Sequence, residues 1–230
     1  MTDPPADLRL RRLTTPRAAA LAGVLFALLF GAALVLIRTA LPEGAEPGSQ
    51  WIAGASGQLR VAAILMPFAG IAFLWFIGVV RDGFGGYEDK FFTSVFLGSG
   101  YLFLAMVFTA SAVGAGLVAS RAETIDVTKR DQVADFATAF LQVLSTTYGL
   151  RMAAVFMISL ATIWLRTGLM PRRLVGLTYL AALSLLLASD LSMWIVLAFP
   201  IWVLAVSVLL LVRAGVIDLH FGEGNSTRRI

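Results

Sequence analysis

The chain has no cysteine and only one histidine, His220, among its 230 residues. Without cysteine it can form no disulfide, thiolate metal site, covalent haem linkage or cysteine nucleophile. A single histidine cannot supply a two-histidine haem site, a His-rich zinc site or a Ser-His-Asp triad inside a membrane. These absences exclude most enzyme and metalloprotein classes, and we therefore predict no catalytic residue, no metal site and no cofactor.

Charged residues are also scarce. They make up 14% of the chain, compared with about 25% in soluble domains. Hydrophobic residues make up 59%, and the mean hydropathy is +0.85, so the composition is that of an integral membrane protein. The net charge of +4 does not indicate nucleic-acid binding, because the basic residues lie between apolar runs rather than along one face.

Six apolar runs are candidates for membrane spans, since about 20 helical residues cross a hydrocarbon core of about 30 Å. The last two runs are separated only by Asp190; joined, they would form a helix of roughly 58 Å, so we expect a hairpin. The sequence thus predicts an all-α polytopic bundle of six transmembrane helices over residues 18–213, flanked by cytoplasmic tails at 1–17 and 214–230. The six runs cover residues 18–37, 61–80, 91–119, 150–165, 174–189 and 191–212.

Basic residues beside the spans predict the orientation, because Lys and Arg accumulate on the cytoplasmic side. With the N-terminus inside, twelve basic residues lie inside and six outside. We therefore expect a multi-pass plasma-membrane protein with both termini in the cytoplasm. The outer six are Arg38, Arg60, Arg121, Lys129, Arg130 and Arg151.

Residues 131–148 form an amphipathic pattern ahead of the fourth span. Apolar side chains recur there every three or four residues, which predicts a helix. This outer helix could be an interfacial or bundle-packed support for the fourth span, or a lid over an outer cavity. Its apolar residues are Val133, Phe136, Phe140, Leu141, Leu144 and Tyr148.

Two ionisable residues are expected at membrane depth, where charge is costly and each such residue is a functional hypothesis. Arg151 lies about 22 Å from Arg166 along a helix, and Asp190 lies about 25 Å from Arg173. Both should therefore sit just below the outer interface. They are a candidate ion pair that fixes helix packing, or, together with Tyr148, a ligand site for an anion or a proton.

Charges also gather where the third span begins, in "YEDKFF". Glu88 and Asp89 stand at an expected helix N-terminus, where anions are stabilised by about 0.3–1 kcal/mol. Arg81 and Lys90 supply a basic flank. We interpret this interface cluster as the point where the helix enters the membrane, with a cytoplasmic docking surface or an active site as alternatives.

Proline and small residues predict details of packing inside the spans. Pro67 and Pro200 each remove a helical hydrogen bond, which makes them candidate kinks of architectural or functional use. The third span carries small residues at four-residue spacing, such as Ser94 with Gly98 and Ala112 with Gly116. That pattern favours close approach of helix backbones.

Four segments of the chain resemble a group of uncharacterised actinobacterial six-span integral membrane proteins with no established activity. The resemblance extends from the first span to Arg213. It implies a compact plasma-membrane protein and carries over no catalytic role. The segments are "MPFAGIAFLWFIGVVRD", "EDKFFTSVFLGSGYLF", "YGLRMAAVFMISLATIWLRTGLMPR" and "WIVLAFPIWVLAVSVLLLVR".

Three functions remain open. The leading hypothesis is a non-enzymatic membrane component that binds membrane lipids, a protein partner or further copies of itself. The alternative is a small-molecule transporter or permease with a site near Arg151 and Asp190, although matching broken helices in two halves are absent. An intramembrane enzyme is the weakest hypothesis, because it would depend on Asp190, Glu88 or Asp89 without histidine or cysteine.

Overall fold

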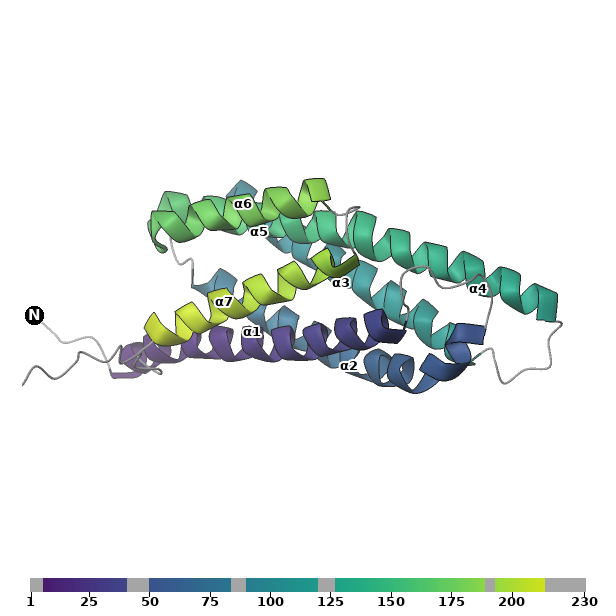
Figure 1. The fold of residues 1–230 in the computed structure, drawn as a ribbon. Helices are drawn as coiled ribbons and strands as arrows, with labels where there is room; N and C mark the ends of the chain where they lie inside the picture. The colour runs from purple at the N-terminus through teal and green to yellow at the C-terminus, as the bar shows by residue number, and fades with distance from the viewer. Residues whose placement is uncertain (1–5, 41–49, 84–89, 120–126, 189–192, 214–230) are drawn as a thin grey trace, which may run out of the picture.

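The computed structural model describes residues 6–40, 50–83, 90–119, 127–188 and 193–213, and all of its regular elements are helices (Figure 1). This confirms the all-α prediction for the described part of the chain. The helices are α1 (Ala6–Ala40), α2 (Gln50–Asp82), α3 (Lys90–Ala119), α4 (Val127–Gln142), the π-helix η3 (Val143–Gly149), α5 (Leu150–Thr167), α6 (Arg172–Ala188), the 3-10 helix η4 (Met193–Leu197) and α7 (Ala198–Arg213).

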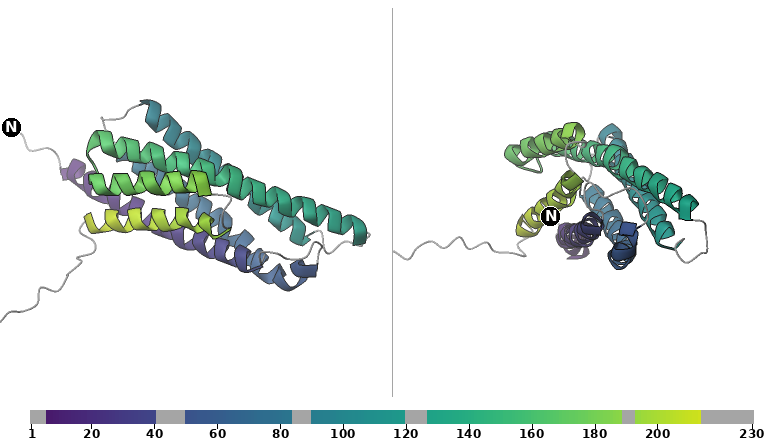
Figure 2. Two further views of the ribbon diagram at one scale, coloured as in Figure 1. Left: turned by 45° about the horizontal axis from the view of Figure 1, so that its top comes forward. Right: turned by 45° about the vertical axis from the view of Figure 1, so that its right-hand side comes forward.

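The long helices run side by side as a bundle (Figures 1 and 2). α1 packs against α2 and α7, α3 packs against α2 and α5, and α6 packs mainly against α5. α4 continues through η3 into α5 and extends past the other described helices (Figure 1). We call the end of the bundle where α1 ends and α2 begins the α4 end, and the opposite end, where α5 stops, the Arg166 end.

Five helical runs among the described residues are long and apolar enough to cross a membrane. They are Ala20–Ala40, Gly57–Asp82, Lys90–Gly116, Gln132–Thr167 and Trp194–Val212. The chain is therefore a helical membrane protein. α6 has only 17 residues, or about 25 Å, which is less than the usual thickness of a hydrocarbon core. Six spans therefore stay a prediction, because the sixth would have to be this short helix.

A tight turn places α6 against α5. α5 ends because Gly168 adopts a left-handed conformation with φ of 67°, which a glycine reaches without steric cost. The Gly168 amide still donates to the Trp164 carbonyl at 3.0 Å. Pro171 follows, and its carbonyl accepts a 2.9 Å bond from the Leu174 amide in the first turn of α6. The two helices therefore fold back on each other.

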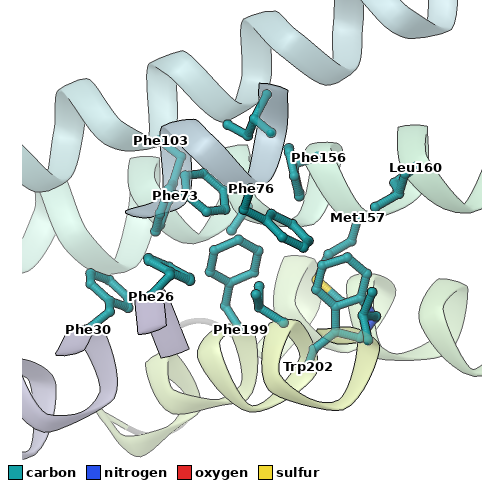
Figure 3. Packing of buried hydrophobic residues seen from close by; sticks show 14 of the residues in the cluster. Phe26, Phe30, Phe73, Phe76, Phe103, Phe156, Met157, Leu160, Phe199 and Trp202 are labelled. Carbon is teal, nitrogen blue, oxygen red and sulfur yellow. The ribbon is translucent and has the colours of Figure 1, made fainter. Parts of the chain in front are cut away.

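The centre of the bundle is filled with aromatic rings (Figure 3). Phe73 of α2 has its ring centroid 4.6 Å from Phe26 of α1, 5.5 Å from Phe103 of α3, 5.3 Å from Phe156 of α5 and 5.8 Å from Phe199 of α7. All five side chains are buried. Ring pairs of this kind add about 0.5–1.5 kcal/mol beyond the area they bury, so this cluster joins five helices.

Close helix contact occurs at one glycine of the third span but not at its neighbour. A methyl group added to Gly100 would lie 2.7 Å from Ile77 Cδ1 and 3.2 Å from Phe156. A methyl group added to Gly98 would meet no atom of another helix within 4 Å. Gly116 is similarly open. The close contact thus lies at Gly100, whereas Gly98 and Gly116, the glycines of the two predicted pairs at four-residue spacing, have no such neighbour.

Candidate functional site at the pi-helical segment

Two charged residues of α2, one within the helix and one in its last turn, bound the apolar part of the bundle. Arg60 and Arg81 are both exposed and are 21 residues apart, or about 31 Å along a helix. That distance matches a hydrocarbon core of about 30 Å. Arg38 lies in the last turn of α1, at the α4 end, and Arg166 lies in the last turn of α5, at the other end.

The run through α4, η3 and α5 is too long to fit between these two levels. Gln132–Thr167 has 36 residues, or about 54 Å of helix. Ser145 of η3 lies 21 residues before Arg166, which is the same separation as that between Arg60 and Arg81. A tilt of about 20° would shorten the rise by only about 6%. The π-helix therefore lies level with the edge of the apolar region, and α4 lies beyond it.

Two hydroxyl groups of the π-helix bond to backbone carbonyls at the end of α4. A π-turn widens the helix and disturbs the regular hydrogen-bond ladder at its start. Ser145 Oγ donates to the Leu141 carbonyl at 2.7 Å, and Thr146 Oγ1 donates to the Gln142 carbonyl at 2.7 Å. These bonds supply side-chain donors to backbone oxygens at the junction of α4 and η3.

Arg151 follows the π-helix and is partly buried. Its guanidinium donates a 2.9 Å hydrogen bond to the Thr147 carbonyl, one turn back, so the side chain points toward the α4 end. A guanidinium has five N–H donors, and Thr147 is its hydrogen-bond partner among the residues that the structure describes. The remaining donors can meet an anion at the edge of the apolar region.

The other predicted members of this site are only partly covered by the structure. Tyr148 lies in η3 and its side chain is exposed, so it can sit beside an anion held by Arg151. Asp190 lies outside the described residues. The nearest described element after it, η4, begins at Met193 and contacts η3.

The structure also describes only part of the predicted interface cluster. Glu88 and Asp89 lie outside the described residues, whereas Arg81 and Lys90 are exposed at the Arg166 end. A further contact there was not predicted: the Arg166 guanidinium lies 4.6 Å from the centre of the Phe92 ring. This cation–π contact joins the end of α5 to the start of α3.

The two prolines occupy different positions in their helices. Pro67 lies within α2, which runs without a break from Gln50 to Asp82. Pro200 lies in the first turn of α7, directly after the 3-10 helix η4. A proline there removes an N–H that an α-helix would leave unbonded in any case. Pro200 thus follows a change of helix type instead of interrupting one long helix.

α4 is a helix as predicted, but its large apolar side chains face away from the bundle. Phe136 is 72% exposed and Val133 is 57% exposed, whereas the small Ala134 and Ala137 are buried. The apolar stripe therefore does not pack on the bundle, and the interfacial form of the predicted support stays a prediction. Helical periodicity shows which residues share a face, and close approach to α3 selected the small-residue face instead. α4 also continues the line of α5 (Figure 1) and does not fold across the bundle as a lid.

Two side-chain hydrogen bonds of α6, one partly buried and one buried, were also missed. Thr162 Oγ1 of α5 and the Tyr179 hydroxyl of α6 lie 2.7 Å apart, and Trp202 Nε1 donates to Thr178 Oγ1 at 3.1 Å. Sequence offers no direct signal for such pairs, because their members are 17 and 24 residues apart.

Metal ligation finds no support within the described residues, which contain no group of three or more His, Asp or Glu side chains able to hold an ion. The resemblance to six-span actinobacterial proteins stays a prediction, because no protein-family model, no curated protein and no solved structure matches the chain.

Proposed function

We propose that this chain is a non-enzymatic plasma-membrane protein that binds lipids or a protein partner. The observation that carries the proposal is the filled interior of the bundle, where Phe73 contacts aromatic rings from four other helices. A transport path needs polar groups that face a space open to water. An enzyme needs convergent acids, bases or nucleophiles. A packed aromatic centre favours neither.

Buried hydroxyls at mid-depth support the same conclusion. Ser99 Oγ donates to the Val95 carbonyl at 2.7 Å, and Ser159 Oγ donates to the Val155 carbonyl at 2.8 Å. Each hydroxyl thus satisfies itself on its own helix, as serine commonly does in membrane helices. These two hydroxyls are therefore satisfied without water, whereas Thr93 Oγ1 and Ser207 Oγ are buried without a hydrogen-bond partner.

The proposed binding surface is the edge of the apolar region at η3. Arg151 and the exposed Tyr148 lie three residues apart, and residues three apart on a helix are near neighbours. A guanidinium pairs well with phosphate or carboxylate oxygens, which suits a lipid headgroup. We further propose that Asp190 pairs with Arg151 and ties the final helices to α5. The contact between η4 and η3 supports this pairing.

We also propose that the chain crosses the membrane six times and keeps both termini in the cytoplasm. The excess of basic residues on one side supports this orientation, and so do the exposed Arg81 and Lys90 at the Arg166 end. In this arrangement Glu88, Asp89 and Lys90 mark where α3 enters the membrane from the cytoplasm.

Native mass spectrometry of the protein released from membranes tests lipid or partner binding. We expect bound phospholipid or a bound protein on the wild type, with phospholipid occupancy at least fivefold lower in Arg151→Gln. Arg60→Gln removes an exposed arginine near the same level and serves as the matched control. Binding equal in all three proteins would contradict the proposed surface. Release of both lipid and partner under the mildest conditions would contradict the function itself.

A transporter is the second candidate, and the π-helix is the observation that favours it. π-turns are rare and often occur at functional sites, and this one lies two residues before Arg151. Proteoliposomes loaded with small anions distinguish the two functions. Flux that depends on both the protein and Arg151 would favour transport, whereas flux equal to that of empty liposomes is expected for a binding protein.

A further inference from the structure

The outward face of α4 is a continuous apolar surface. Val133, Phe136 and Phe140 are exposed along it, and Val143 continues the same line into η3. The Phe136 and Phe140 rings stack with centroids 6.2 Å apart. An adjacent side of α4 is held to the bundle by Ala134 and Ala137, which are buried. We call Val133, Phe136, Phe140 and Val143 the α4 seam.

The upper part of the α4 seam lies outside the hydrocarbon. Phe140 is 26 residues from Arg166 and Phe136 is 30 residues away, or about 39 Å and 45 Å of helix. The hydrocarbon core is about 30 Å thick, and the bilayer with its headgroups is about 40–45 Å thick. Phe136 is thus at or beyond the headgroups, where lipid tails cannot cover it. A large exposed apolar face in such a place marks an interaction site.

The spacing of the α4 seam is that of a coiled coil. Its members follow one another at intervals of three, four and three residues, which are the a and d positions of the heptad repeat. A stripe this narrow suits one facing helix of the same kind better than a broad concave surface.

A second copy of this chain is the partner that fits best. Two copies inserted in one membrane with the same orientation hold their α4 helices parallel and at the same height, as a parallel coiled coil requires. Lys129 continues the spacing of the α4 seam one turn before Val133, but the positions that flank the seam from Gln132 to Leu144 carry no charge that would repel an identical helix. They are Gln132, Ala137, Ala139 and Leu144, and Asp135 lies on the far side.

We propose that the α4 seam is a homodimer interface outside the membrane. Confinement to a membrane raises the effective concentration of the two copies, so two short heptads can suffice. The interface ends at η3, because a π-turn adds a residue and rotates the helix that follows. Below that point α5 is covered by α6 from its own chain.

Cysteine crosslinking in intact membranes tests this proposal, since the natural chain has no cysteine. We would introduce Val133→Cys and Phe140→Cys singly and oxidise with copper phenanthroline. Asp135→Cys is the matched control, because it is exposed at the same height but about 200° around the helix from Val133. We expect a disulfide-linked dimer from both seam variants, at least fivefold above the control. Equal crosslinking of the control, or none from either seam variant, would overturn the proposal.

Co-purification of two differently tagged copies gives a second test that needs no cysteine. Phe136→Ser with Phe140→Ser should reduce recovery of the second tag at least tenfold. Phe91→Ser is the control, because Phe91 is 69% exposed but lies at the Arg166 end. Circular dichroism should show unchanged helix content in both. Recovery of the second tag that stays high in the seam variant would overturn the proposal. In the crosslinking experiment, a disulfide between the seam and a different protein would also overturn it.

Discussion

Trp202 of α7 donates its indole N–H to Thr178 Oγ1 of α6 at 3.1 Å. Thr178 is completely buried, so the bond lies in the interior. α6 packs mainly against α5 and makes few contacts with α7. This bond is therefore a main specific link between the short α6 and the helix that follows it.

Replacing Thr178 with Val should destabilise the bundle. Val keeps the shape of the side chain but leaves the Trp202 N–H without its acceptor, and an unsatisfied buried donor costs about 1–3 kcal/mol. Unfolding in mixed micelles measures the loss. Ser184→Ala is the control, because this exposed hydroxyl bonds only to its own helix at Leu180 and should change stability by less than about 0.5 kcal/mol. Equal effects of the two changes would contradict this role of the bond.

Gly23 should tolerate no larger residue. A methyl group added there would overlap the Ser207 hydroxyl and would lie 2.8 Å from the Phe76 ring. Overpacking of this kind costs about 1–3 kcal/mol, so Gly23→Ala should lower the unfolding temperature. Gly31→Ala in the same helix is the control, because a methyl group added there would meet no other side chain within 4 Å. If Gly23→Ala proved as stable as Gly31→Ala, the close contact of α1 with α7 would be wrong.

Exchanging the charges of the proposed ion pair tests the link between α5 and the last helices. Arg151→Asp and Asp190→Arg should each reduce the yield of folded protein, because each leaves two like charges together near the membrane interface. The double variant should recover most of the yield. The coupling is measured as a double-mutant cycle, and a double variant at least as poor as the sum of the singles would show that the two residues do not pair.

Much of the fold could be predicted, because a membrane helix needs about 20 apolar residues and such runs are unmistakable. What those helices pack against could not be. The spans are apolar on all sides, so nothing in their pattern distinguishes Phe73, which lies in the core, from the exposed Phe68.

The sequence named Arg151, Tyr148 and Asp190 as a candidate site, which stays a prediction, but it gave no sign of the π-helix. The position of Arg151 relative to Arg166 indicated its depth. No composition rule predicts the π-helix that precedes it, since that depends on how α4 and α5 both pack on α3. The same packing turned the large side chains of α4 outward.

Water access to the interior tests the central claim, that the bundle has a filled core and works by binding. Ser159→Cys and Ser99→Cys place small thiols at two buried positions in a chain without other cysteines. Gln142→Cys, which is exposed on α4, is the positive control. Membranes are treated with a charged methanethiosulfonate reagent from each side. The account predicts rapid labelling of the control and none of the two interior thiols; labelling of either interior thiol from one side would reveal a water-filled path and contradict it.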